Sequence, residues 1–145
     1  MALSFALTLT LTLTLEDPLD DLYDDQAEGS SLGSLDEDQA GVMLDQGVPV
    51  VDIRRPAEWE ETGVLAGSHR ITFFDEANQY DLASWLVALD AVVDRNQPFI
   101  LVCRMGVRTE VVGRYLSGEL GLPHVHHLQH GISAWIGHGL PVESV

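Results

Sequence analysis

The feature that most restricts the fold is a pair of short, largely apolar runs, residues 50–54 (VVDIR) and 99–103 (FILVC). A proline, Pro49 or Pro98, immediately precedes each run and separates it from the chain before it. Short apolar runs bounded by such residues are typical of parallel strands that are covered on both faces. The two runs therefore predict two central strands of a parallel sheet.

Two helices with apolar stripes are predicted around the second run. In each, the apolar residues recur every three or four positions, which places them on one helix face. The first stripe comprises Leu82, Trp85, Leu86, Leu89, Val92 and Val93. The second, which we expect to face inward before a stop at Gly121, comprises Val111, Val112, Tyr115, Leu116 and Leu120.

Further elements complete an alternating pattern. Residues 34–37 (SLDE) fit a capping box that opens a helix ending near Gly47. Residues 124–128 are predicted to form another strand, and residues 132–136 a short closing helix that ends before Gly139. Strands that alternate with helices indicate an α/β domain with a parallel sheet.

The charge of the chain is strongly acidic. Among 145 residues, 23 are Asp or Glu and 7 are Lys or Arg, which gives a formal net charge of −16. Such a charge argues against nucleic acid or an anionic membrane surface as a partner. Eleven of the acidic residues lie within residues 16–45, so most of the charge belongs to the amino-terminal part and not to the globular body.

The amino-terminal segment differs in composition from the rest. Leu and Thr alternate within residues 3–15, and residues 16–29 are acidic with little to bury. We expect residues 1–29 to be a poorly ordered, low-complexity extension and residues 30–145 to form the domain. No run reaches the roughly 18 apolar residues of a membrane span, and the basic start of a signal peptide is missing, so we expect a cytoplasmic protein rather than an exported one.

The candidate reactive group is Cys103, the single cysteine, which begins the segment 103–109 (CRMGVRT). A lone cysteine is more often an inert core residue, but this one lies where a buried strand ends and a helix begins, the usual ligand site of open α/β sheets. Loop N–H groups, the positive end of the helix, Arg104 and Arg108 all favour the thiolate, which is the reactive form. Gly106 allows the positive φ angle that a closed loop requires.

Four motifs in this order resemble the rhodanese family. CRMGVR is similar to the active-site loop Cys-Arg-x-Gly-x-Arg, and VVDIR is similar to the first signature strand, with Asp52 and Arg54 in the characteristic places. The Glu58-Trp59 pair followed by residues 62–68 resembles the second signature, and residues 130–142 resemble the closing segment. The similarity covers residues 30–143.

Some positions depart from the family pattern. Val64 stands where many members have His, and Ser68 stands where they have Ala. His130 replaces the first of two common glycines, and we expect it to narrow the rim of the pocket. These departures bear on the subfamily and not on the sulfur chemistry.

The resemblance implies a rhodanese-like α/β fold, with about five parallel strands flanked by helices on both faces. It also implies a thiosulfate sulfurtransferase without a cofactor, in which Cys103 takes sulfur from a small donor as a persulfide and passes it to a thiol or cyanide. The residues that the resemblance assigns to substrate binding are Arg104, Met105, Gly106, Val107 and Arg108.

The roles that the resemblance suggests differ between these residues. Arg108 would brace the loop, and Arg104 would attract the anionic donor. Thr109 and His130 would support the site, and Asp52 with Arg54 would tie strand ends together rather than take part in chemistry.

Three alternatives remain open. The protein could be a persulfide carrier or interaction module with little turnover, for which a protein sulfur acceptor is the partner. It could be a phosphatase or arsenate reductase, although related loops of that kind place five residues between Cys and Arg, whereas four separate Cys103 from Arg108. His124, His126, His127 and His130 suggest a metal site, but alternate residues of a strand face opposite sides, so we expect no metal. The physiological donor, the acceptor and the oligomeric state are left undetermined.

Overall fold

The computed structural model describes residues 31–145, so the extension predicted over residues 1–29 lies outside the described residues. Five parallel strands form one sheet in the order β1-β5-β4-β2-β3. The strands are β1 (Gly33–Leu35), β2 (Val50–Asp52), β3 (His69–Arg70), β4 (Phe99–Val102) and β5 (Val125–Leu128). The predicted α/β fold with a parallel sheet of about five strands is confirmed.

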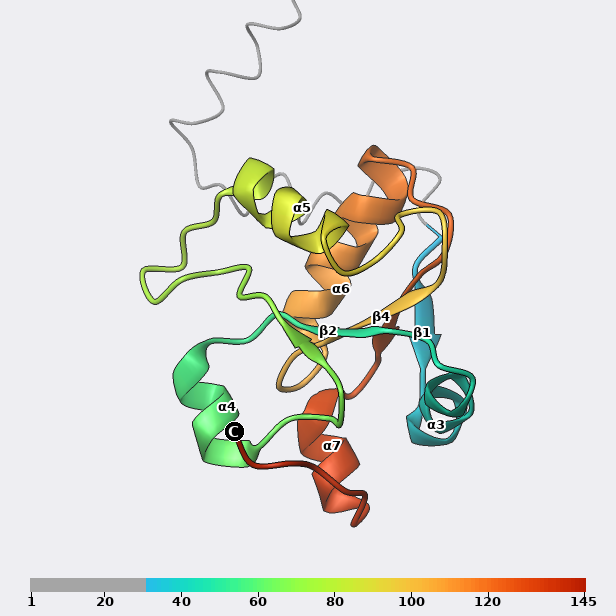
Figure 1. Ribbon diagram of the computed structural model, residues 1–145, viewed down its shortest axis with the longest axis vertical. Helices are drawn as coiled ribbons and strands as arrows, with labels where there is room; N and C mark the ends of the chain where they lie inside the picture. Colours follow the sequence, from blue (N-terminus) through green and yellow to red (C-terminus); the bar gives the residue numbers. More distant parts are fainter. Residues whose placement is uncertain (1–30) are drawn as a thin grey trace, which may run out of the picture.

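Helices cover both faces of this sheet (Figure 1). On one face lie α5 (Leu82–Asp90) and α6 (Val107–Arg114), and α6 continues into a π-helical turn, η2 (Tyr115–Glu119). On the other side lie α3 (Glu37–Asp45), α4 (Pro56–Thr62) and α7 (Gly131–Gly137). The sheet is therefore a middle layer between two helical layers.

The central strand β4 shows why both layers are needed. Phe99 and Leu101 belong to the core cluster under α5 and α6, whereas Ile100 and Val102 belong to the cluster that contains residues of α3 and α7. All four are at most 1% exposed. Because successive side chains of a strand point to opposite faces, an uninterrupted apolar run needs cover on both sides.

The first described helix begins two residues later than the sequence analysis predicted. Asp36 is its N-cap: the Asp36 carboxylate accepts the N–H of Gln39 at 2.8 Å, and Gln39 Oε1 accepts the N–H of Asp36 at 2.9 Å. Ser34, the predicted cap, is instead part of β1. The pattern Asp-x-x-Gln therefore prevails over Ser-x-x-Glu, because pairing with β5 extends residues 33–35.

The prediction that Leu120 faces inward is wrong. In η2 the N–H of Leu120 bonds to the carbonyl of Tyr115, five residues earlier, and Leu120 is 37% exposed. Such a wide turn takes up an extra residue and changes the phase of the apolar stripe. Leu122, which is 5% exposed, packs into the core beyond the turn.

The sequence patterns did not predict α4, β1 and β3. In α4 none of the residues is fully buried, so it has no apolar stripe, and the two strands are only three and two residues long.

In residues 31–145 we find no helix that is both long and apolar enough to cross a membrane.

Candidate active site

Cys103 lies directly after β4, at the carboxyl edge of the sheet. Its side chain is 1% exposed, and its Sγ accepts the N–H of Gly106 at 3.2 Å. Gly106 is the N-cap of α6 and has a φ of 93°, as the sequence predicted for a closed loop. A Cβ at this position would collide with the carbonyl oxygen of Gln129, so the loop can close around the sulfur only with glycine here.

The start of α7 fixes the first two residues of this loop. Backbone N–H groups of Ile132 and Ser133 donate to the carbonyl oxygens of Cys103 and Arg104, both at 3.0 Å. Gly131 has a φ of 73°, and a Cβ there would collide with the Arg104 carbonyl. His130 is the exposed N-cap residue of α7, which places it at the edge of the loop and not against the sulfur.

Glu58 of α4 joins both loop arginines. Arg108 donates two hydrogen bonds to the Glu58 carboxylate, at 3.0 and 2.8 Å, and Arg104 Nε donates a longer one at 3.3 Å. Arg104 also donates to Glu61 at 2.8 Å. Burial acts to raise the pKa of Glu58, but the hydrogen bonds from Arg108, the Arg55 backbone and Arg104 outweigh it and lower that pKa to about 2.

These pairs change the electrostatics expected from the sequence. The hydrogen bonds that Arg108 donates to Glu58 raise the pKa of Arg108, so both partners are fully charged at neutral pH. Two carboxylates from α4 therefore balance the two arginines near Cys103. In the described part of the chain, the hydrogen bonds of the Arg108 side chain run to Glu58 and not to loop carbonyls, in contrast to the predicted bracing role.

Asp52 and Arg54 form a second, fully buried pair at the end of β2. Arg54 is 0% exposed and donates from Nε and Nη2 to the Asp52 carboxylate at distances of 2.9–3.2 Å. Its other bonds reach Thr62 Oγ1 at 2.8 Å and the Gly63 carbonyl at 3.0 Å. This pair therefore ties β2 to the end of α4 and has no exposed atoms to offer a ligand.

Thr109 and His127 form a buried polar group on the other side of the sulfur. Thr109 Oγ1 lies 3.5 Å from Cys103 Sγ and 2.8 Å from His127 Nδ1. Burial, aided by the charge of His130, lowers the pKa of His127 to about 4. From the sequence, His127 is a candidate only for a metal site. Strand alternation, which turns it away from His126, is the signal that could have placed it beside Thr109.

The four histidines of residues 124–130 are spread over different surroundings. His127 is buried, His126 is half-buried, and His124 and His130 are exposed. Within residues 31–145, no three or more His, Cys, Asp or Glu side chains gather as potential metal ligands.

Solved structures with the same fold cover most of this chain. A protein of unknown function from Rhodopseudomonas palustris, described as a possible tyrosine phosphatase, is 26% identical, with 88% of this chain and 95% of that chain covered and a TM-score of 0.59. A rhodanese-like domain protein from Staphylococcus aureus is 23% identical (78% and 100% covered, TM-score 0.57). The polysulfide-sulfur transferase of Wolinella succinogenes is 17% identical (88% and 91% covered, TM-score 0.62).

Sequence comparison gives the family. No curated protein sequence matches the chain. The model of the rhodanese-like domain, however, matches residues 36–138, which contain β2, the Cys103 loop and α7. The motif order, the five-stranded parallel sheet and this match agree: the chain belongs to the rhodanese-like family.

Proposed function

We propose that this protein is a sulfurtransferase that moves sulfane sulfur from thiosulfate or a similar donor to a thiol or cyanide through a persulfide on Cys103. The observation that carries the proposal is the position of the Cys103 sulfur. It lies at the carboxyl end of β4, bonded to the N–H of Gly106, in a loop with only four residues between Cys103 and Arg108. A loop N–H that already points at the sulfur suits a reaction in which negative charge resides on sulfur.

In the first half-reaction, the Cys103 thiolate attacks the outer sulfur of thiosulfate. The new Sγ–S bond forms as the S–S bond of the donor breaks, and sulfite leaves with the electron pair. The terminal sulfur then carries one negative charge, and the loop amides, of which the N–H of Gly106 already bonds to Sγ, would hold it. Arg108 remains a cation, since its bond to Glu58 raises its pKa, and it supplies positive charge to this step.

In the second half-reaction, an acceptor nucleophile attacks the terminal sulfur, and Cys103 Sγ leaves as the thiolate. Neither step changes the net charge or needs a cofactor. The covalent intermediate predicts ping-pong kinetics, in which the donor product leaves before the acceptor reacts.

Of the two loop arginines, Arg104 is the better candidate for contact with an anionic donor. Its bond to Glu58 is the longer one, and its bond to Glu61 is exposed to solvent, with side-chain exposures of 36% and 65%. A sulfonate can therefore replace a carboxylate at Arg104 at a lower cost than at Arg108, where both carboxylate oxygens are bonded.

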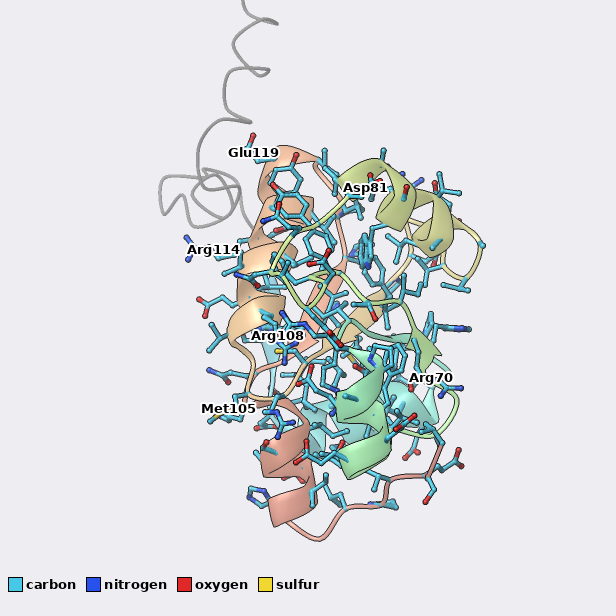
Figure 2. All side chains as sticks on the ribbon, turned by 90° about the vertical axis from the view of Figure 1, so that its left-hand side faces the viewer. Arg70, Asp81, Met105, Arg108, Arg114 and Glu119 are labelled. Carbon is cyan, nitrogen blue, oxygen red and sulfur yellow. The ribbon has the colours of Figure 1, made fainter. Side chains whose placement is uncertain are left out.

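A persulfide carrier with little turnover is the second candidate, and two observations favour it. Pairing with Glu58 and Glu61 reduces the positive charge available to a small anion. Met105 and Val107, in or next to the loop, are 64% and 61% exposed, and Figure 2 shows Met105 at the edge of the molecule while Arg108 lies further in. Exposed apolar side chains beside a reactive group suit contact with a protein acceptor.

Steady-state kinetics with thiosulfate, 3-mercaptopyruvate and glutathione persulfide, read as thiocyanate formed from cyanide, separate the two candidates. Turnover of one donor with parallel double-reciprocal lines supports the enzyme. Stoichiometric loading of Cys103 with negligible turnover of all three supports the carrier. Cys103→Ser is the matched control, and thiocyanate formation by that variant would exclude both.

A phosphatase activity is tested in the same preparation. A ring closed by four intervening residues fits a single sulfur atom, whereas a phosphoryl group under attack needs a wider ring of donors. We therefore expect the protein to hydrolyse p-nitrophenyl phosphate no faster than Cys103→Ser does. Robust hydrolysis that depends on Cys103 would overturn the argument from loop size.

A further inference from the structure

A line of polar groups leads from Cys103 across the sheet edge to the first strand. Thr109 Oγ1 of α6 lies 3.5 Å from Cys103 Sγ and 2.8 Å from Nδ1 of His127 in β5. The other ring nitrogen, His127 Nε2, lies 3.2 Å from the hydroxyl of Ser34 in β1. Thr109 is 0% exposed and His127 is 2% exposed, so water does not replace the contact between them, whereas Ser34 is exposed.

The number of protons in this line is limited. A hydroxyl has one proton to donate and two lone pairs to accept with, and a neutral imidazole has one N–H and one acceptor nitrogen. Because burial, with the charge of His130, lowers the pKa of His127 to about 4, only about one ring in a thousand is protonated at pH 7. His127 is therefore a poor base for the Cys103 thiol, but it remains a hydrogen-bond donor or acceptor.

The hydrogen bonds of this line can run in two directions, which differ in the nitrogen of His127 that carries the proton. If His127 Nδ1 is the acceptor, Thr109 gives its only proton to the ring and has none for the sulfur. If His127 Nδ1 carries the proton, it donates to Thr109 Oγ1, and Ser34 donates to Nε2. The Thr109 proton is then free for Cys103 Sγ or for the Gly106 carbonyl, which lies 3.2 Å away. A negative charge on Sγ selects the bond to sulfur, because charge-assisted hydrogen bonds are the stronger ones.

We propose that His127 is a positioning residue whose Nδ1–H tautomer directs the hydroxyl proton of Thr109 onto the Cys103 sulfur. This inference rests on the proposed persulfide function for its purpose, since Sγ carries negative charge as the nucleophile of the first half-reaction and as the leaving group of the second. The N–H of Gly106 and the O–H of Thr109 would then donate to the same sulfur. Chains of hydrogen bonds that run in one direction strengthen one another in a buried site.

Other charged groups lie on the elements packed around this loop, and they bear on any pH profile. They are Arg104 of the loop, Arg108 of α6, Glu58 and Glu61 of α4, the Asp52–Arg54 pair at the end of β2, and His130 at the start of α7. His130 is the one histidine of this set, and it is exposed. A His130→Asn background therefore removes its contribution from the test.

The first experiment measures the rate at which iodoacetamide alkylates Cys103 between pH 5 and 10. This reaction needs no sulfur donor, so it reports on the thiolate whether or not the protein is a sulfurtransferase. We expect Thr109→Val and His127→Leu each to slow alkylation at pH 7 about tenfold and to move the midpoint of the profile to higher pH. Thr109→Ser, which restores the hydroxyl, should return the rate to within about twofold of the native protein.

The matched control is Ser117→Ala. Ser117 lies in η2, is 4% exposed and donates to the Gly113 carbonyl, so its removal tests the loss of a buried hydroxyl that is not beside the sulfur. Its alkylation profile should equal that of the native protein. Circular dichroism and thermal unfolding show which variants are folded, and Thr109→Val, which nearly preserves the shape of the side chain, keeps the test decisive if His127→Leu does not fold.

The second experiment reads the tautomer directly. Long-range ¹H–¹⁵N correlation spectra distinguish Nδ1–H from Nε2–H rings, and His127→Asn assigns the His127 signals. We expect the Nδ1–H form at pH 7 to 8. The Nε2–H form would contradict the proposal.

Three further outcomes of the alkylation experiment would each overturn one part of the proposals. Native-like alkylation by a folded Thr109→Val would overturn the role of the hydroxyl, and slowed alkylation by Thr109→Val alone, with a native-like folded His127→Leu, would overturn the role of His127. Shifted profiles in both variants, together with no sulfur transfer by the native protein, would leave the hydrogen-bond line in place and refute the proposed function instead.

Discussion

Two neighbouring strands, β2 and β4, end side by side, and each is followed by arginines that pair with a carboxylate. After β2, Arg54 and Asp52 are 0% and 1% exposed. After β4, Arg108 and its partner Glu58 are 24% and 15% exposed, and Arg104 and Glu61 are 36% and 65% exposed. The same type of arginine–carboxylate pair therefore occurs once in the interior and once at the surface. The difference in burial distinguishes a structural pair from pairs that a ligand can reach.

The buried pair cannot be exchanged for a ligand. Removal of one partner would leave a charge without water, which costs far more than the pair itself contributes. The pairs at the end of β4 remain in contact with solvent, so their net contribution to stability is small, and an anion can compete for the arginines. We therefore assign the end of β2 to stability and the end of β4 to the proposed activity.

The largest effect is expected for Arg54→Met. It leaves Asp52 buried without its partner, and we expect the free energy of unfolding to fall by about 3–5 kcal/mol. Urea denaturation measures this loss. The double variant Asp52→Ala, Arg54→Met should recover part of it, whereas a loss below about 1 kcal/mol in the single variant would show that the two regions do not differ.

Arg108→Lys should lower activity and leave stability nearly unchanged, the reverse of what we expect for Arg54→Met. Lysine keeps the charge but not the planar fork on both oxygens of Glu58, so the positive charge that serves the first half-reaction is no longer held in place. We expect kcat/KM for thiosulfate to fall at least tenfold, about 1.4 kcal/mol of transition-state stabilisation, with a change in unfolding free energy below about 1 kcal/mol. Unchanged kinetics would mean that Arg108 supplies only general charge.

Acid should weaken the Glu58 contacts. Burial acts to raise the pKa of Glu58. Hydrogen bonds from Arg108, the Arg55 backbone and Arg104 outweigh burial and lower this pKa to about 2 in the folded state, below the ordinary value of 4.5. A depressed pKa stabilises the fold above pH 4.5, and this contribution is lost as the pH falls from 4.5 toward 2. After allowance for solvent screening, we expect about 1 kcal/mol, measured as the difference between the native protein and Glu58→Gln in urea denaturation at pH 6 and pH 3. An equal pH response of the two proteins would show that the Glu58 contacts do not stabilise the fold.

The smallest effect is expected for Glu61→Gln. Because this carboxylate is 65% exposed, its loss should change the unfolding free energy by less than about 0.5 kcal/mol. It frees part of Arg104, so KM for thiosulfate should fall about twofold while a neutral donor is unaffected. A rise in KM would show that Arg104 does not meet the donor.

The sequence was sufficient to predict the fold class and the reactive loop. The apolar runs that became β2 and β4, the stripe of α5 and the positive φ of Gly106 each follow from a few neighbouring residues. The short elements α4 and β3 carry no such local pattern. Their position depends on tertiary contacts such as the bonds from Arg54 to Thr62 and Gly63.

Local sequence patterns could not predict the electrostatics of the site. Arg108 and Glu58 are 50 residues apart in the chain, and Thr109 and His127 are 18 apart, so only the folded sheet brings each pair together. From the sequence alone we expect a positive loop around Cys103. The structure shows a balanced one, because α4 places Glu58 and Glu61 against the arginines.

Intact-protein mass spectrometry of the thiosulfate-treated protein tests the central claim most directly. The native protein should gain the mass of one sulfur atom, cyanide should remove it with release of thiocyanate, and Cys103→Ser should gain nothing. A native protein that stays unmodified by every sulfane donor, while its thiol is free and its fold intact, would contradict the persulfide on Cys103 and the sulfur transfer that depends on it.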